Sequence, residues 1–146
     1  MANVHDVAAY ILGRLGSMTT MKLQKLVYYS QGWSLAWDGE PLFPEKIQAW
    51  ANGPVVYDLF RQHRGQFRVS EWPSGNPESL STSQRETIDA VLGAYGHLSG
   101  QALSDKTHEE RPWLDAREGL APGAASGVEL SLDEMQDFFG GLASAL

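Results

Sequence analysis

The most suggestive catalytic residues in this chain are Asp105 and His108. They lie three positions apart, so on a helix their side chains share a face and could form an acid–base pair. A hydrolase would use such a pair to activate a nucleophile, but the sequence has no Gly-x-Ser-x-Gly turn and no cysteine. We therefore interpret Asp105 and His108 as a hydrogen-bonded pair that stabilises a short helix, with a small hydrolase as the alternative.

Metal and cofactor motifs are also missing from the sequence. The histidines lie far apart and show no His-Glu-x-x-His spacing: His5, His63, His97 and His108. The run His108-Glu109-Glu110 cannot direct three consecutive side chains at one ion. No phosphate loop or dinucleotide fingerprint occurs either. We expect no metal, no cofactor and no enzymatic activity.

A second stretch, residues 22–33, is rich in side chains that recognise proteins. Helical spacing predicts one face directed at the core, made of Leu23, Leu26, Val27 and Trp33. Lysine and tyrosine side chains then fall on other faces, and an exposed tyrosine with amide neighbours suits protein binding. The predicted contact residues are Lys22, Lys25, Tyr28 and Tyr29. The alternative is that both tyrosines pack beneath neighbouring helices.

The elements that position these residues are predicted to be mainly helical. Alanine and leucine number 32, against 11 for valine and isoleucine. Apolar spacing and capping residues predict helices over residues 4–15, 20–37, 55–63, 83–98, 101–107, 112–116 and 131–146. Short strands are expected at 47–50 and 67–70, so the fold is a compact helical bundle with at most a small two- or three-stranded sheet.

Length and motif positions predict one domain. A chain of 146 residues is close to the commonest domain size. We expect a domain over residues 1–117, a Gly/Ala-rich linker over 118–130 and a C-terminal helix of the same domain over 131–146. Gly53 and Pro54 are expected to form a tight turn, and Trp50 is expected to pack into the core.

Charge is distributed unevenly along the chain, whose net charge is −7. Residues 1–70 carry a balance of +2, and residues 71–146 carry −9. The acidic half argues against nucleic-acid binding and against a transcriptional autoregulator, and it suits docking onto a basic partner. No apolar run is long enough to cross a membrane and no signal peptide is apparent, so a cytoplasmic protein is expected.

Four pieces of the sequence resemble, in order, the Panacea-domain family of SocA-like antitoxins, also described as phage-associated proteins similar to GepA. The first is the run Met21-Lys22-Leu23-Gln24-Lys25-Leu26-Val27-Tyr28-Tyr29-Ser30-Gln31-Gly32-Trp33. The others are Gly39-Glu40-Pro41-Leu42-Phe43, then Ile47-Gln48-Ala49-Trp50 with Gly53-Pro54-Val55, then Leu103-Ser104-x-x-Thr107-His108-x-x-x-Pro112-Trp113-x-x-Ala116-Arg117. The resemblance extends over residues 4–117.

The resemblance implies an antitoxin of a type II toxin–antitoxin system that binds a co-encoded protein toxin. Toxins of this family include translation inhibitors such as alarmone-synthetase-like enzymes, and one branch delivers its toxin to the ClpXP protease. A family that neutralises unrelated toxins should keep its motifs for folding and vary its contact surface. The predicted scaffold residues are Leu23, Gln24, Trp33, Trp50, Gly53, Pro54, Thr107, His108, Pro112, Trp113 and Arg117.

Overall fold

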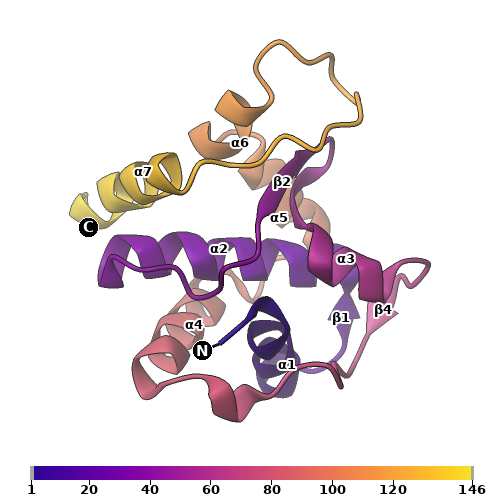
Figure 1. Cartoon of the computed structure of the whole chain (residues 1–146), viewed down its shortest axis with the longest axis vertical. Coiled ribbons are helices and arrows are strands. Elements are labelled where there is room, and N and C mark those ends of the chain that lie inside the picture. Colours follow the sequence, from indigo (N-terminus) through magenta and orange to yellow (C-terminus); the bar gives the residue numbers. More distant parts are fainter. Residues whose placement is uncertain (1, 146) are drawn as a thin grey trace.

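The longest helix, α2 (Thr20–Asp38), runs through the middle of the molecule in the computed structural model, which describes residues 2–145 (Figure 1). Helices α1, α4, α5 and α7 all pack against it. The described helices are α1 (Val4–Leu15), α2, α3 (Tyr57–His63), α4 (Thr82–Tyr95), α5 (Gly100–Thr107), α6 (Arg111–Ala116), α7 (Leu132–Ser144) and the short 3-10 helix η1 (Pro77–Ser79). The described strands are β1 (Met18–Thr19), β2 (Ile47–Trp50), β3 (Gly53–Val56) and β4 (Arg68–Val69). The prediction of a mainly helical fold with little sheet is confirmed.

The first two helices begin and end where side-chain chemistry directs them. Asn3 caps α1 in a reciprocal capping box with Asp6, and Gly16 follows the last residue with a positive φ. Thr19 caps α2 by accepting a hydrogen bond from the Lys22 N–H at 3.1 Å. The predicted bounds of α1 are confirmed, and the predicted end of α2 differs by one residue.

Helix α2 has no solvent-facing stripe along its central part. Residues 23–35 are all buried, which is far more than the single face that helical spacing predicts. Polar side chains in this stretch, apart from the Tyr28 hydroxyl, are satisfied by hydrogen bonds: Gln31, for example, accepts from the N–H of Leu42 at 2.7 Å and donates to the Phe43 carbonyl at 2.9 Å. The helix is therefore a central element, surrounded on every side.

Strands β2 and β3 form an antiparallel hairpin in which Ile47 pairs with Val56 and Trp50 pairs with Gly53. The predicted helix over residues 55–63 is wrong at its start, because residues 53–56 pair with β2 and helix α3 begins only at Tyr57. Pro54, predicted in a turn, lies inside β3. The missing N–H of Pro54 costs no hydrogen bond between β2 and β3, because the main-chain groups of Pro54 face away from β2. Its carbonyl instead accepts a hydrogen bond from Lys25 of α2.

Two smaller differences concern local pairing and capping. The short strand predicted near residue 68 exists, and its partner is Met18–Thr19, which no local pattern indicates. Helix α4, predicted to start at residue 83, begins at Thr82, because Ser81 forms its capping box: Ser81 accepts from the Gln84 N–H, and the Gln84 side chain accepts from the Ser81 N–H. These two hydrogen bonds are 3.1 and 2.9 Å long, respectively.

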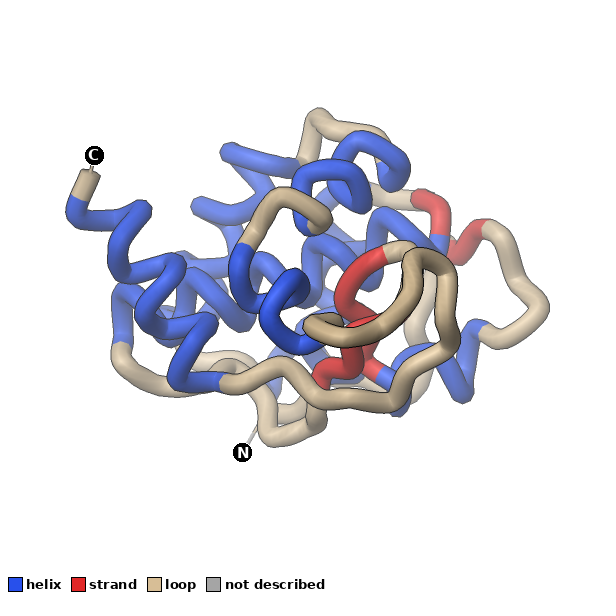
Figure 2. Tube along the Cα trace, turned by 90° about the horizontal axis from the view of Figure 1, so that it is seen from above, coloured by secondary structure: helices blue, strands red, loops and turns tan. Residues whose placement is uncertain are grey.

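The segment between α6 and α7, residues 117–131, runs back along β2 before α7 begins (Figures 1 and 2). Ala49 N–H donates to the Val128 carbonyl at 2.7 Å, and Leu130 N–H donates to the Ile47 carbonyl at 2.8 Å. Helix α7 then packs on α2 with Met135 and Phe139 fully buried, whereas Leu132 and Leu142 stay partly exposed. Among the helices of residues 2–145, none has both the length and the apolar composition needed to cross a bilayer.

Candidate protein-binding surface

Two adjacent polar residues of α2, Gln24 and Lys25, hold the outer edge of strand β3. The Gln24 side chain accepts a hydrogen bond from the Val56 N–H at 2.8 Å and donates one to the Val56 carbonyl at 3.2 Å. The Lys25 ammonium donates to the Pro54 carbonyl at 3.2 Å. Side chains thus satisfy the main-chain groups that β2 cannot reach, as burial of a strand edge requires.

The other strand, β2, is held by two side chains from the end of α6. The guanidinium of Arg117 donates to the Ala49 carbonyl at 2.9 Å, and the Trp113 indole N–H donates to the Trp50 carbonyl at 2.8 Å. The His108 ring stacks on the Trp113 ring with centroids 4.2 Å apart. Trp113 and Arg117 therefore hold the main chain of β2, and His108, at the end of α5, supports the Trp113 ring.

At the hairpin turn, side chains of α2 and α5 lie close to the main chain of the hairpin. Ser104 donates to the Asn52 carbonyl at 2.5 Å. A Cβ atom placed on Gly53 would lie 2.5 Å from Lys25 Cε and 2.9 Å from Thr107 Oγ1, and Gly53 has a φ of +118°. Glycine is needed here for both the backbone conformation and the close packing of Lys25.

The contact surface predicted on α2 is wrong for three of its four residues. Lys25 is 2% exposed, and Tyr28 and Tyr29 are fully buried, because α5 and α7 cover the face expected to meet solvent. The remaining residue, Lys22, is half-buried and donates to the Gly96 carbonyl at 2.6 Å. The alternative, that both tyrosines pack beneath neighbouring helices, is confirmed.

Tyr29 belongs to a buried polar cluster between α2, α4 and α6. Its hydroxyl donates to Glu110 at 2.9 Å, and its ring stacks on Tyr95 at a centroid distance of 4.2 Å. Among the described residues, the hydroxyl of Tyr28 has no hydrogen-bond partner. Burial raises the pKa of Glu110 to about 7, against the stabilising hydrogen bond from Tyr29, and burial also raises the pKa of Tyr29.

The predicted hydrogen bond between Asp105 and His108 is also wrong. Asp105 is exposed and accepts a hydrogen bond from Gln101 at 2.9 Å. His108 is half-buried, and its Nε2 has no partner within the described part of the chain. Burial lowers the pKa of His108, and the Asp105 carboxylate opposes this shift. Within residues 2–145, no three His, Asp or Glu side chains lie close enough together to hold a metal ion.

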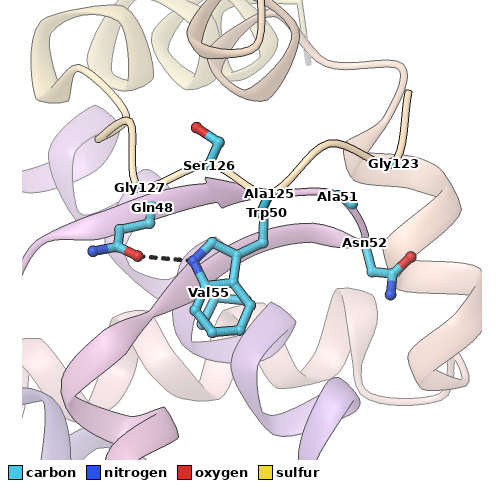
Figure 3. Close-up of a pocket in the computed structure, with 9 residues that line it drawn as sticks. All are labelled: Gln48, Trp50, Ala51, Asn52, Val55, Gly123, Ala125, Ser126 and Gly127. Atoms are coloured by element: carbon cyan, nitrogen blue, oxygen red, sulfur yellow. Dashed lines mark hydrogen bonds between the residues drawn. The ribbon is translucent and has the colours of Figure 1, made fainter. Parts of the chain in front are cut away.

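Trp50 points away from the core, contrary to the prediction. Gln48 and Trp50 share one face of β2, and Val55 lies opposite Gln48 on β3. The Trp50 indole N–H donates to the Gln48 side chain at 2.8 Å (Figure 3). The indole ring meets Phe60 edge-on at a centroid distance of 4.8 Å. We call this surface, made of Gln48, Trp50 and Val55, the outward face of the hairpin.

A cleft of about 630 Å³ opens beside the outward face. Its other wall is part of the segment that follows α6, and small residues line it: Gly123, Ala125, Ser126 and Gly127 (Figure 3). We call this space the hairpin cleft. Its size is within the range of natural ligand-binding clefts, and its aromatic wall is the kind of surface that contributes strongly to protein binding.

Comparison with protein families gives a match over the region that builds and holds the hairpin. The family model described as antitoxin SocA-like, Panacea domain, matches residues 23–114, more than half of the chain. The chain belongs to this antitoxin family. Searches of curated proteins and of solved structures gave no match.

The Panacea domain supplies the hairpin and most of the side chains that hold it. Gln24, Lys25 and Trp113 lie inside the matched region, and the cleft wall at residues 123–127 lies beyond it. Most of the predicted scaffold is buried: Leu23, Gln24, Trp33, Gly53, Pro54, Thr107, Pro112 and Arg117. The alternation of residues 47–50 could have indicated that Gln48 and Trp50 share a face. No local pattern indicates that residues 123–127 lie opposite them.

The close packing at the hairpin turn gives a testable expectation. We expect Gly53→Ala to lower the free energy of unfolding by about 2–4 kcal/mol, from backbone strain together with overpacking. Gly119 also has a positive φ, of +83°, but a Cβ atom there would meet nothing within 4 Å. Gly119→Ala is thus the matched control and should cost about 1 kcal/mol. Urea denaturation of both variants measures the difference, and equal losses would contradict the packing argument.

Proposed function

We propose that this Panacea-domain protein is the antitoxin of a type II toxin–antitoxin system. It neutralises a co-encoded protein toxin by binding it directly. The observation that carries the proposal is the use of the motif side chains: Gln24, Lys25, Trp113 and Arg117 bond to main-chain groups of one hairpin. This arrangement supports a rigid binding module whose exposed surface meets the partner.

The partner is a protein toxin that acts on an essential process, and a translation inhibitor such as an alarmone-synthetase-like enzyme is the class we favour. Such a toxin acts in the cytoplasm, where we place the complex. Residues 1–117 form the antitoxin domain in this proposal, and α7 belongs to the same folded unit. The burial of Phe139 against Tyr28, Tyr29 and Trp33 supports this assignment of α7.

Co-expression tests the proposal. The protein expressed alone should be harmless to cells, and the product of the neighbouring gene should stop growth. Expressing both should restore growth, and the two proteins should co-purify as a complex of 1:1 or 2:2 stoichiometry. Persistent toxicity without a complex would contradict the antitoxin function.

A matched experiment separates direct neutralisation from delivery to the ClpXP protease. The same co-expression is carried out in cells that lack ClpXP, and toxin levels are followed by immunoblotting. Direct neutralisation predicts restored growth with an unchanged amount of toxin. Growth that is restored only when ClpXP is present, together with loss of the toxin, would identify the protein as a proteolytic adaptor.

A further inference from the structure

The hairpin cleft has one wall with large side chains and one wall with almost none. The half-buried Trp50 and the mostly buried Val55 provide the apolar lining on the hairpin side. Across from them, Gly123, Ala125 and Gly127 bring the main chain close without filling the space (Figure 3). The cleft is therefore shaped to accept a bulky apolar side chain from outside.

The segment that forms the small-residue wall belongs to a part of the chain in which every charged residue is acidic. Residues 118–146 contain five acidic residues and no lysine or arginine. Glu129 is exposed and lies directly opposite Gln48 in the bridge between this segment and β2. Arg117, the nearest preceding cation, is buried, and three main-chain carbonyls use its guanidinium. We call Glu129 and the chain around it the acidic rim: it belongs to a region with a net charge of −5, although the exposed Lys46 lies near Glu129.

The opposite end of the outward face has a different charge. Arg64 lies over the Phe60 ring at 5.2 Å, next to the Trp50 indole that packs against Phe60. Glu129 on one rim and the Arg64 cation near Trp50 would orient a charged partner along the cleft.

A second copy of this chain does not match this surface. In a symmetric dimer the same acidic rim would face itself, and each chain carries a net charge of −7. Like-charge juxtaposition across an interface is costly, whereas a basic segment is attracted to the rim.

We propose that the hairpin cleft is the docking site for the toxin, and that its occupant is a segment of the toxin in which a bulky apolar residue is flanked by lysine or arginine. This inference rests on the proposed function. The apolar residue packs against Trp50 and Val55, and the basic neighbours face Glu129 on the acidic rim.

The position of the cleft also explains how one scaffold could select one toxin. The family match covers the hairpin wall of the cleft, and the small-residue wall lies outside it. Residues 123–127 therefore act as the specificity-determining wall. Changing them alters the shape of the cleft without touching the hydrogen bonds from Gln24, Lys25 and Trp113 that hold the hairpin.

Two pairs of variants test the proposal by calorimetric titration with the purified product of the neighbouring gene. Ala125→Arg fills the cleft and adds a positive charge, and Ala121→Arg makes the same change outside the cleft lining of the same segment. Glu129→Lys reverses a charge on the rim, and Glu86→Lys does so at an exposed site on α4. Circular dichroism melts verify that each variant is folded.

We expect Ala125→Arg to weaken binding at least thirtyfold and Glu129→Lys at least tenfold at low salt, while each control stays within about threefold of wild type. Wild-type affinity should fall as salt is raised, and the effect of Glu129→Lys should shrink with it. If wild type binds and both cleft variants bind equally well, or if the affinity is insensitive to salt, the inference is wrong and the antitoxin function stands. If wild type does not bind at all, the proposed function fails, and the docking site fails with it.

Discussion

Replacing Trp33 by alanine should lower the free energy of unfolding by about 3–5 kcal/mol, the usual range for removing a buried tryptophan side chain. Trp33 is 7% exposed, and its ring packs against Phe139 of α7 at a centroid distance of 5.5 Å. Its indole N–H donates to the Tyr95 hydroxyl at 3.0 Å, so the substitution also removes a buried hydrogen bond. The loss affects the contacts of α2 with α4 and α7 together.

Trp37, one helical turn further along α2, provides the matched control. Its ring packs against that of Trp33 in a tilted arrangement, with a centroid distance of 4.7 Å, but Trp37 is 45% exposed, so Trp37→Ala should cost about 1 kcal/mol or less. Urea denaturation followed by far-ultraviolet circular dichroism measures both values. The Trp33 variant should also lose toxin binding at temperatures where it is unfolded. Equal losses of unfolding free energy for the two variants would contradict the prediction that burial of Trp33 against Phe139 of α7 stabilises the fold.

The free energy of unfolding should depend on pH through two buried groups, Glu110 and Lys25. Burial raises the pKa of Glu110 to about 7, so the folded state keeps a proton that the unfolded chain releases at lower pH. Stability should therefore fall by about 2–3 kcal/mol as the pH rises from about 4.5 to 7. Burial lowers the pKa of Lys25 to about 8, so the folded state releases its proton first. Stability should rise by a similar amount between about pH 8 and 10.5.

Together, these two groups predict a minimum of stability between about pH 7 and 8. Other groups act in neighbouring ranges: burial lowers the pKa of His63 and His108, which adds a rise below about pH 6.5, and burial raises the pKa of Tyr28 and Tyr29, which adds a fall above about pH 10. Differences between wild type and single variants remove these shared contributions.

Two variants and two controls isolate the groups. Glu110→Gln should abolish the fall between about pH 4.5 and 7, whereas the exposed neighbour Glu109→Gln should leave it unchanged. Lys25→Met should abolish the rise above pH 8, and the exposed Lys46→Met should not. The measurement is the free energy of unfolding in urea at intervals of one pH unit. A difference curve that stays flat for Glu110→Gln would show that this carboxyl group titrates normally.

Several elements of this protein could be predicted from the sequence because short-range chemistry determines them. The apolar spacing and the glycine after Leu15 locate α1, and Thr19 and Ser131 mark the starts of α2 and α7. The family motif likewise depends only on residue types in order, and the match over residues 23–114 confirms it. Each of these signals is contained within a few consecutive residues or in their order along the chain.

The tertiary structure alone determined which polar residues of α2 are buried. Helical spacing predicts which residues share a face of the helix. Which of these faces are buried depends on how many other elements pack around the helix. Gln24 and Lys25 are paired with main-chain groups 29–32 residues away, and Tyr29 is paired with a carboxylate 81 residues away. A local pattern cannot show such partners, so it predicts that these lysine and tyrosine side chains face solvent. For the same reason, the cleft between Trp50 and residues 123–127 exists only because the chain returns to the hairpin after α6.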